Sequence, residues 1–286
     1  MSTSIPTSAR TVVLQNHPLA DQDVDLSSSP SGTFTVKEIP LAHPIPEDSL
    51  LVQTLYLSND TGIRHFIEKS AKYEDDIPTL PLGSPILVFR SIVRVIQVGG
   101  GDGVGSFKAG DIVEMWQSQW ADYVVVKKDK ARPIKQRLGI SLSAHLGTIG
   151  SPGASAYWAL TDVLKTKQTG TIVVSGASGA VGNVAVQFAK HVMGVKNVVG
   201  IASSDEKCKW LKSIGADDAV NYKSPTFVGD LRKATLDGVD SFLDNVGGFI
   251  LDEVMMRMKS HGIICAMGFM AGEFIILLSL ESLWLT

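Results

Sequence analysis

Residues 172–182, IVVSGASGAVG, decide the fold of this chain. A short β-branched run ends at Gly176, and two further glycines follow at a fixed interval, Gly179 and Gly182. Beyond them apolar residues recur at helical spacing, so strand, glycine turn and helix come in that order. Such a turn aims backbone N–H groups and a helix N-terminus at a phosphate. Because a second strand over 197–201 arrives where a βαβ unit needs it, the stretch predicts a dinucleotide-binding domain.

The composition is that of an ordinary globular protein with a sizeable core. The 286 residues are 44% hydrophobic and 19% charged, with a net charge of −3. This charge offers little attraction to nucleic acid or to an anionic membrane. Two cysteines are too few for a disulfide framework or a four-thiolate zinc site, and the N-terminus lacks an apolar signal segment. We therefore expect a cytoplasmic protein, with neither nucleic acid nor membrane among its partners.

The first half of the chain has many short β-rich runs separated by Gly/Pro turns. Strands are expected at 11–14, 34–39, 50–56, 86–98, 111–115 and 121–126. Because almost no helical pattern interrupts them, the first half predicts an all-β, barrel-like domain.

The pattern changes near His145, after which strands alternate with amphipathic helices. Strands are expected at 171–175, 197–201, 219–222, 239–243 and 262–267, and helices at 155–165, 180–193, 205–214, 225–235 and 249–259. Alternation of this kind is typical of a parallel, doubly wound sheet. We therefore predict an α/β protein with one domain over 1–145 and a second over 146–286.

The end of the second strand of the βαβ unit bears on the choice of dinucleotide. An NAD site usually keeps an acid there for the ribose 2′-hydroxyl, but this strand ends in Ser203 and Ser204. Asp205 and Glu206 come later, where acids suit the first turn of a helix. Lys207 can reach a 2′-phosphate, or it can be an ordinary solvated lysine. The pattern favours NADP and leaves the role of Lys207 open.

Several further segments carry a family resemblance. They are LYLSNDTGIR (55–64), GDIVEMWQSQWADY (110–123), LGTIGSPGASAYWAL (146–160), GASGAVGNVAVQFAK (176–190), SSDEK (203–207), GADDAVNYK (215–223) and DNVGG (244–248). In these the chain resembles the medium-chain dehydrogenase/reductases, in the zinc-independent branch of prostaglandin reductases and alkenal double-bond reductases. The resemblance implies a GroES-like β-barrel domain for substrate and catalysis, followed by a Rossmann domain that binds NADP.

The resemblance also implies which residues contact the cofactor, NADPH. The pyrophosphate would be bound by the glycine turn, at Ser178, Gly179, Ala180 and Val181. The 2′-phosphate would be bound after the second and third strands, at Ser203, Lys207 and Tyr222. The nicotinamide and its ribose would be bound after the last two strands, at Asn245, Gly268, Phe269 and Met270.

The activity implied by the resemblance is hydride transfer from NADPH to the carbon–carbon double bond of an α,β-unsaturated aldehyde or ketone. The expected partner is thus a small enal or enone, and a homodimer is allowed for. A zinc-dependent alcohol dehydrogenase is the nearest alternative by fold, but no cysteine occurs in residues 1–207 to build its site. A quinone oxidoreductase, or an NADPH-binding protein with little catalysis, remain the alternatives.

The sequence departs from the family pattern in two places. Where the family often has a tyrosine in Asp-Pro-Tyr-Met-Arg, this chain has Gly62, and we assign no catalytic acid. After Gly268 the resemblance stops, and residues 269–286 read FMAGEFIILLSLESLWLT. We expect a Rossmann domain that is C-terminally truncated and lacks the usual return segment, with reduced stability and turnover.

Overall fold

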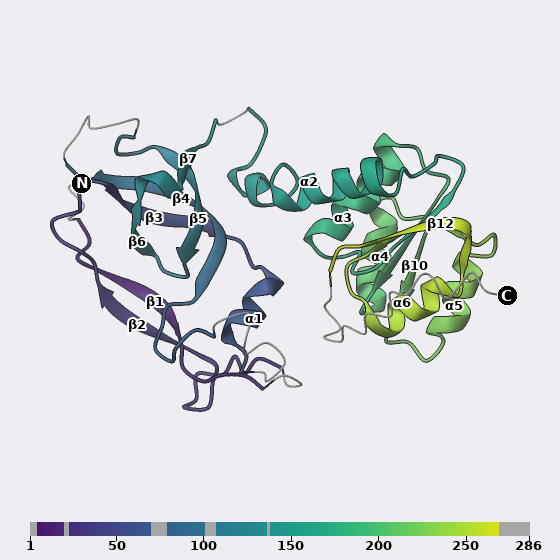
Figure 1. The fold of residues 1–286 in the computed structure, drawn as a ribbon, viewed down its shortest axis with the longest axis horizontal. Helices are drawn as coiled ribbons and strands as arrows, with labels where there is room; N and C mark the ends of the chain where they lie inside the picture. Colours follow the sequence, from purple (N-terminus) through teal and green to yellow (C-terminus); the bar gives the residue numbers. More distant parts are fainter. Residues whose placement is uncertain (1–4, 20–22, 70–78, 101–106, 136–137, 269–286) are drawn as a thin grey trace. The chain divides into compact units, whose positions relative to one another are not determined.

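The computed structural model describes residues 5–19, 23–69, 79–100, 107–135 and 138–268. The chain divides into two compact units, Met1–Leu146 and Gly147–Thr286 (Figure 1). No helix in the described ranges is long and apolar enough to cross a membrane.

The first unit consists mainly of antiparallel strands (Figure 1). They are β1 (Ser8–Leu14), β2 (Phe34–Pro40), β3 (Ser49–Leu57), β4 (Leu87–Val98), β5 (Ile112–Gln119), β6 (Tyr123–Lys127) and β7 (Ala131–Pro133). β1 pairs with β2, and the other five form a sheet in the order β6-β3-β4-β5-β7. A short helix, α1 (Arg64–Ile67), follows β3 after a 3-10 turn.

Strand β4 is the central strand of the five-stranded sheet. It pairs with β3 on one side and with β5 on the other. Val93 and Val95, two residues apart and so on one face, are buried in a cluster with Leu50, Val113 and Met115. β-Branched side chains suit such a covered, pleated surface, which explains why this long run forms the middle of the sheet.

The second unit is a parallel sheet covered by helices on both faces. Its strands are β8 (Thr171–Val174), β9 (Asn197–Ala202), β10 (Asp218–Asn221), β11 (Val239–Asp244) and β12 (Met258–Ala266), and its helices are α2 (Ser151–Trp158), α3 (Ala180–Gln187), α4 (Asp205–Ser213), α5 (Phe227–Ala234) and α6 (Gly248–Met255). The strand order is β10-β9-β8-β11-β12. The order therefore reverses between β8 and β11, at the centre of the sheet.

The side chains of β8 show why both faces of the sheet are covered. Ile172 and Val174 belong to a buried cluster with side chains of α2, α3 and α4, whereas Val173 belongs to a second cluster with side chains of α5 and α6. Successive side chains of a strand point to opposite faces, so an uninterrupted apolar strand requires helices on each.

The predicted fold class, an α/β protein with a β-rich first part and a doubly wound parallel sheet, is confirmed. The helix predicted over 249–259 is wrong at its end, because α6 stops at Met255 and β12 begins at Met258. Met258 pairs with Val239 of β11, and this tertiary pairing overrides the local apolar pattern. Strand β7 and helix α1 were not predicted. The expected truncation concerns residues 269–286, which lie outside the described ranges.

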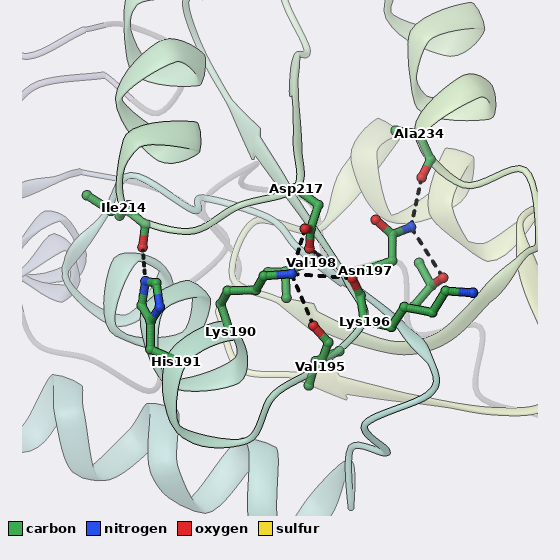
Figure 2. Close-up of polar contacts among 10 residues, drawn as sticks. Lys190, His191, Val195, Lys196, Asn197, Val198, Ile214, Asp217 and Ala234 are labelled. Carbon is green, nitrogen blue, oxygen red and sulfur yellow. Dashed lines mark hydrogen bonds and ion pairs between the residues drawn. The ribbon is translucent and has the colours of Figure 1, made fainter.

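A polar cluster joins the amino ends of the parallel strands to the residues that follow α3 (Figure 2). Lys190 Nζ lies 2.6 Å from Asp217 Oδ1 and 3.4 Å from the carbonyl oxygen of Val195. The other carboxylate oxygen of Asp217 accepts the N–H of Val198, at 2.8 Å. Asp217 thus pairs with an ammonium and with a backbone N–H of β9, at the end of the sheet opposite the glycine turn.

The substitution Asp217→Ala is expected to destabilise the second unit by about 1–3 kcal/mol, because it leaves the N–H of Val198 without its acceptor and Lys190 without its carboxylate. Denaturant unfolding measures the change. Lys196→Met is the matched control, since the exposed Lys196 ammonium points away from the cluster in Figure 2, and its effect is expected within about 0.5 kcal/mol. Equal midpoints for the two variants would contradict the role given to Asp217.

Candidate functional site

The sequence-predicted site residues of the second unit follow the carboxyl ends of its parallel strands. Neighbouring strand ends are tied by backbone hydrogen bonds, such as Tyr222 N–H to the carbonyl of Ala202 at 3.0 Å and Ala177 N–H to the carbonyl of Ile201 at 3.0 Å. In an open α/β sheet, ligands bind outside the carboxyl ends where the strand order reverses. Tyr222 follows β10, and Ser203 and Lys207 follow β9. Ser178, Gly179, Ala180 and Val181 follow β8, Asn245 follows β11, and Gly268 follows β12.

The glycine turn after β8 is closely packed against its own helix. Gly176 has φ +55°, a left-handed conformation that favours glycine. A Cβ at Gly182 would lie 2.5 Å from the carbonyl oxygen of Gly176 and 2.6 Å from the Cα of Ala177. Any side chain at position 182 would therefore separate α3 from the turn.

The N-terminus of α3 is open at this turn. Gly179 is its N-cap, and no side chain of the described residues caps it. The first N–H groups of a helix have no partner within the helix, and the helix dipole places partial positive charge there. The segment Ser178–Val181 thus has the chemistry of an anion site.

The end of β9 holds a lysine close to two hydroxyl side chains. Lys207 Nζ lies 3.1 Å from Ser203 Oγ, and Ser204 Oγ caps α4 by accepting the N–H of Lys207 at 3.2 Å. Tyr222 follows the neighbouring strand β10, where its N–H is bonded to the end of β9. The structure therefore brings Ser203, Lys207 and Tyr222 to one corner of the sheet edge, with a positive charge among them.

A buried carboxyl group joins the ends of β8 and β11. Asp244 has no exposed surface, and its Oδ1 accepts the hydroxyl of Ser175 at 2.7 Å and the N–H groups of Val246 at 3.0 Å and Gly247 at 3.1 Å. Buried polar groups are stable only when hydrogen-bonded, and this one has three donors around it. The loop after β11 is thereby folded around the side chain that precedes it.

Asn245, next in the chain, is fixed by the same arrangement. Its N–H donates to Ser175 Oγ at 2.8 Å, and its side-chain Nδ2 donates to the carbonyl of Ser175 at 2.7 Å. On the other side, a Cβ at Gly268 would lie 2.6 Å from the carbonyl oxygen of Asn245, so the chain after β12 comes very close. Asn245 and Gly268 are therefore neighbours at this edge.

Sequence reasoning missed Ser175 and Asp244, whose hydrogen bonds hold Asn245 in place. The available signal was their place at the ends of two apolar strands, where polar residues are expected to meet in a parallel sheet. The predicted residues Phe269 and Met270 lie outside the described ranges.

In the first unit, Gly62 lies against an aromatic ring. A Cβ at this position would meet Phe89 Cε2 at 3.2 Å, and the Phe89 ring stacks edge-on with Phe66 at 6.0 Å between centroids. At the position where the family often has a tyrosine, this chain thus has a glycine next to the aromatic ring of Phe89.

The described residues contain no group of three or more His, Cys, Asp or Glu side chains that could hold a metal ion. Both cysteines are buried free thiols, and burial raises the pKa of Cys208 and of Cys265. Within the described ranges, the donor set of a zinc site is therefore not supplied.

Comparison with known proteins places this geometry in a family. The family model for zinc-binding dehydrogenases matches residues 180–286. Prostaglandin reductase 1 of Bos taurus is 34% identical over 83% of this chain and 68% of its own length. The NADP(+)-dependent 2-alkenal reductase of Nicotiana tabacum is 34% identical over 82% of this chain and 66% of its own length.

A solved structure agrees with these relatives. CurA from Vibrio vulnificus in complex with NADPH is similar with a TM-score of 0.76 and 26% identity, over 91% of this chain and 72% of that one. The chain belongs to the medium-chain dehydrogenase/reductase superfamily. Within it, the similarity to prostaglandin reductase and 2-alkenal reductase places the chain in the zinc-independent reductase branch.

The substitution Gly182→Ala is expected to destabilise the protein by about 1–3 kcal/mol, because its Cβ overlaps the backbone of the glycine turn. Thermal unfolding measures the loss. Gly229→Ala in α5 is the control, since a Cβ there meets nothing within 4 Å, and alanine should stabilise that helix by about 1 kcal/mol. A Gly182→Ala protein as stable as the wild type would show that the turn is not closely packed.

Proposed function

We propose that this protein is an NADPH-dependent reductase that transfers hydride to the carbon–carbon double bond of an α,β-unsaturated aldehyde or ketone. The protein is an NADP-dependent oxidoreductase, and its cofactor is NADP(H). Reduction of a carbon–carbon double bond is proposed because the chain is 34% identical to an NADP(+)-dependent 2-alkenal reductase. The polar and glycine residues that the structure describes at the carboxyl edge support the binding of the cofactor.

The residues of this edge fit the chemistry of the cofactor. The uncapped N-terminus of α3 offers N–H donors to a pyrophosphate, and the Lys207 corner offers a cation to a 2′-phosphate. Asn245 would lie toward the nicotinamide ribose. The residues proposed to hold NADPH are Ser178, Gly179, Ala180, Val181, Ser203, Lys207, Tyr222, Asn245, Gly268, Phe269 and Met270.

When bound, NADPH supplies the hydride, and the contribution of the chain is to bind and orient. Lys207 neutralises phosphate charge at one end of the row. At the other end, the two hydrogen bonds to Ser175 hold Asn245 in one orientation without a rearrangement on binding. A preformed site of this kind lowers the entropic cost of placing the cofactor.

We further propose that the two units divide these tasks. The Rossmann unit would bind NADP, and the first unit, with Gly62 beside Phe89, would contribute to the substrate site. Because a glycine replaces the phenol often present in the family, no side chain is assigned as proton donor. A cytoplasmic location and a homodimer belong to the same proposal.

The variant Lys207→Ala is expected to lose roughly 1.5–3 kcal/mol of NADPH binding and little NADH binding, because only NADPH carries the phosphate that the ammonium contacts. Fluorescence titration of both cofactors measures the difference. Lys209→Ala is the matched control, since Lys209 is also an exposed lysine of α4 but lies two residues along, on the opposite face. Equal losses for both lysine variants would overturn the assignment of Lys207.

Turnover with NADPH is expected on a panel of enals and enones and to be weaker on quinones. Consumption of NADPH at 340 nm, with product analysis for the saturated carbonyl compound, provides the measurement. A preference for quinones would favour the quinone oxidoreductase alternative. Tight NADPH binding with no turnover on either panel would favour a cofactor-binding protein with little catalysis.

A further inference from the structure

An acid close to the proposed phosphate corner, Asp205, is restrained by a residue from the next strand. Asp205, in the first turn of α4, accepts a hydrogen bond from the side-chain amide of Asn221, at 2.8 Å between Nδ2 and Oδ1. Asn221 is the last residue of β10, the edge strand of the sheet. The bond therefore draws the carboxylate of Asp205 from the end of β9 toward the edge of the sheet.

The surroundings of Asp205 agree with this direction. Together with Cys208, Lys212, Asp218 and Asn221 it lines an open pocket of about 450 Å³ beside β10. Burial raises the pKa of the Cys208 thiol, and the nearby charge of Asp205 adds to the increase, as expected if the carboxylate lies on the Cys208 face of α4.

Lys207 lies on the other side of the same helical turn. Residues two apart in a helix do not share a face, and the ammonium of Lys207 reaches back to Ser203 Oγ at 3.1 Å. The charge of Asp205 is thus directed toward β10, and that of Lys207 toward the end of β9.

An acid at the end of this strand is the feature that favours NAD, since a carboxylate accepts the ribose 2′-hydroxyl and repels a 2′-phosphate. Asp205 is close enough in sequence to act in this way if its side chain were free to turn. We propose that Asn221 is a specificity-determining residue, which anchors Asp205 at the edge of the sheet and so keeps that carboxylate away from the 2′-phosphate. The inference rests on the proposed NADP site at Ser203 and Lys207.

The test compares binding of NADPH and NADH by wild type, Asn221→Ala, and Asn221→Ala combined with Asp205→Asn, using fluorescence titration. Asn221→Ala is expected to bind NADPH roughly tenfold more weakly. This is the effect of the Coulomb repulsion in water between a carboxylate and a doubly charged phosphate about 6 Å away. NADH binding should be unchanged or stronger. The double variant should regain the NADPH preference of the wild type, because the repelling charge is gone.

An unchanged ratio of the two dissociation constants in Asn221→Ala, or equal weakening of both cofactors without rescue by Asp205→Asn, would overturn the inference. A wild-type protein without preference for NADPH would instead overturn the proposed NADP site, so the two failures are distinguishable.

A second test exchanges the amide of Asn221 and the carboxylate of Asp205. It preserves the local turn, in which Asn221 Oδ1 accepts the N–H of Lys223 at 3.0 Å. Asn221→Asp keeps this acceptor but places two carboxylates together, so the preference for NADPH should fall. Adding Asp205→Asn restores one amide and one carboxylate in reversed positions and should restore the preference. Failure of the swap to restore it, in proteins of normal thermal stability, would contradict the anchoring role.

Discussion

The hydrogen bonds of the buried Asp244 carboxyl group are the constraint on which the rest of the site depends. A fully buried acid without donors would be costly, so the hydroxyl of Ser175 and two backbone N–H groups must surround it. Because Ser175 belongs to the end of β8 and the N–H groups to the loop after β11, the two central strand ends cannot separate without leaving these groups unpaired. The hydrogen bond between Ser175 and Asp244 therefore also fixes the position of Asn245, which is bonded to Ser175.

The parallel sheet places different tasks at its two ends. At the amino end, Lys190 and Asp217 satisfy one another and a backbone N–H of β9, which stabilises the fold. At the carboxyl end, several donors remain available, notably those of the uncapped N-terminus of α3. Stability supplied at the amino end allows the carboxyl edge to keep the first N–H groups of α3 without a side-chain cap.

Much of this arrangement could be predicted from local sequence. The strand, glycine turn and helix at 172–182 were predictable because period and glycine spacing are local signals. The cofactor roles of Lys207 and Tyr222 were inferred from short family motifs and stay a prediction. The pairing of Ser175 with Asp244 was not predictable, since 69 residues separate them and only the strand order makes β8 and β11 neighbours. The early end of α6 was missed for a related reason, because β12 forms by pairing with β11.

The two helix N-termini at the carboxyl edge show why residue type alone did not determine the choice of cofactor. Helix α3 begins at a glycine and has no side-chain cap, whereas in α4 the hydroxyl of Ser204 caps the N–H of Lys207. At α4, selectivity in the proposed site would therefore come from side-chain charges, and the sequence places Asp205 and Glu206 directly before Lys207. Helical geometry separates Asp205 from Lys207, and in the role proposed for Asn221 its hydrogen bond to Asp205 leaves Lys207 as the residue that faces the end of β9. In the proposed NADP site, recognition at this corner would thus depend on the tertiary contact between α4 and β10.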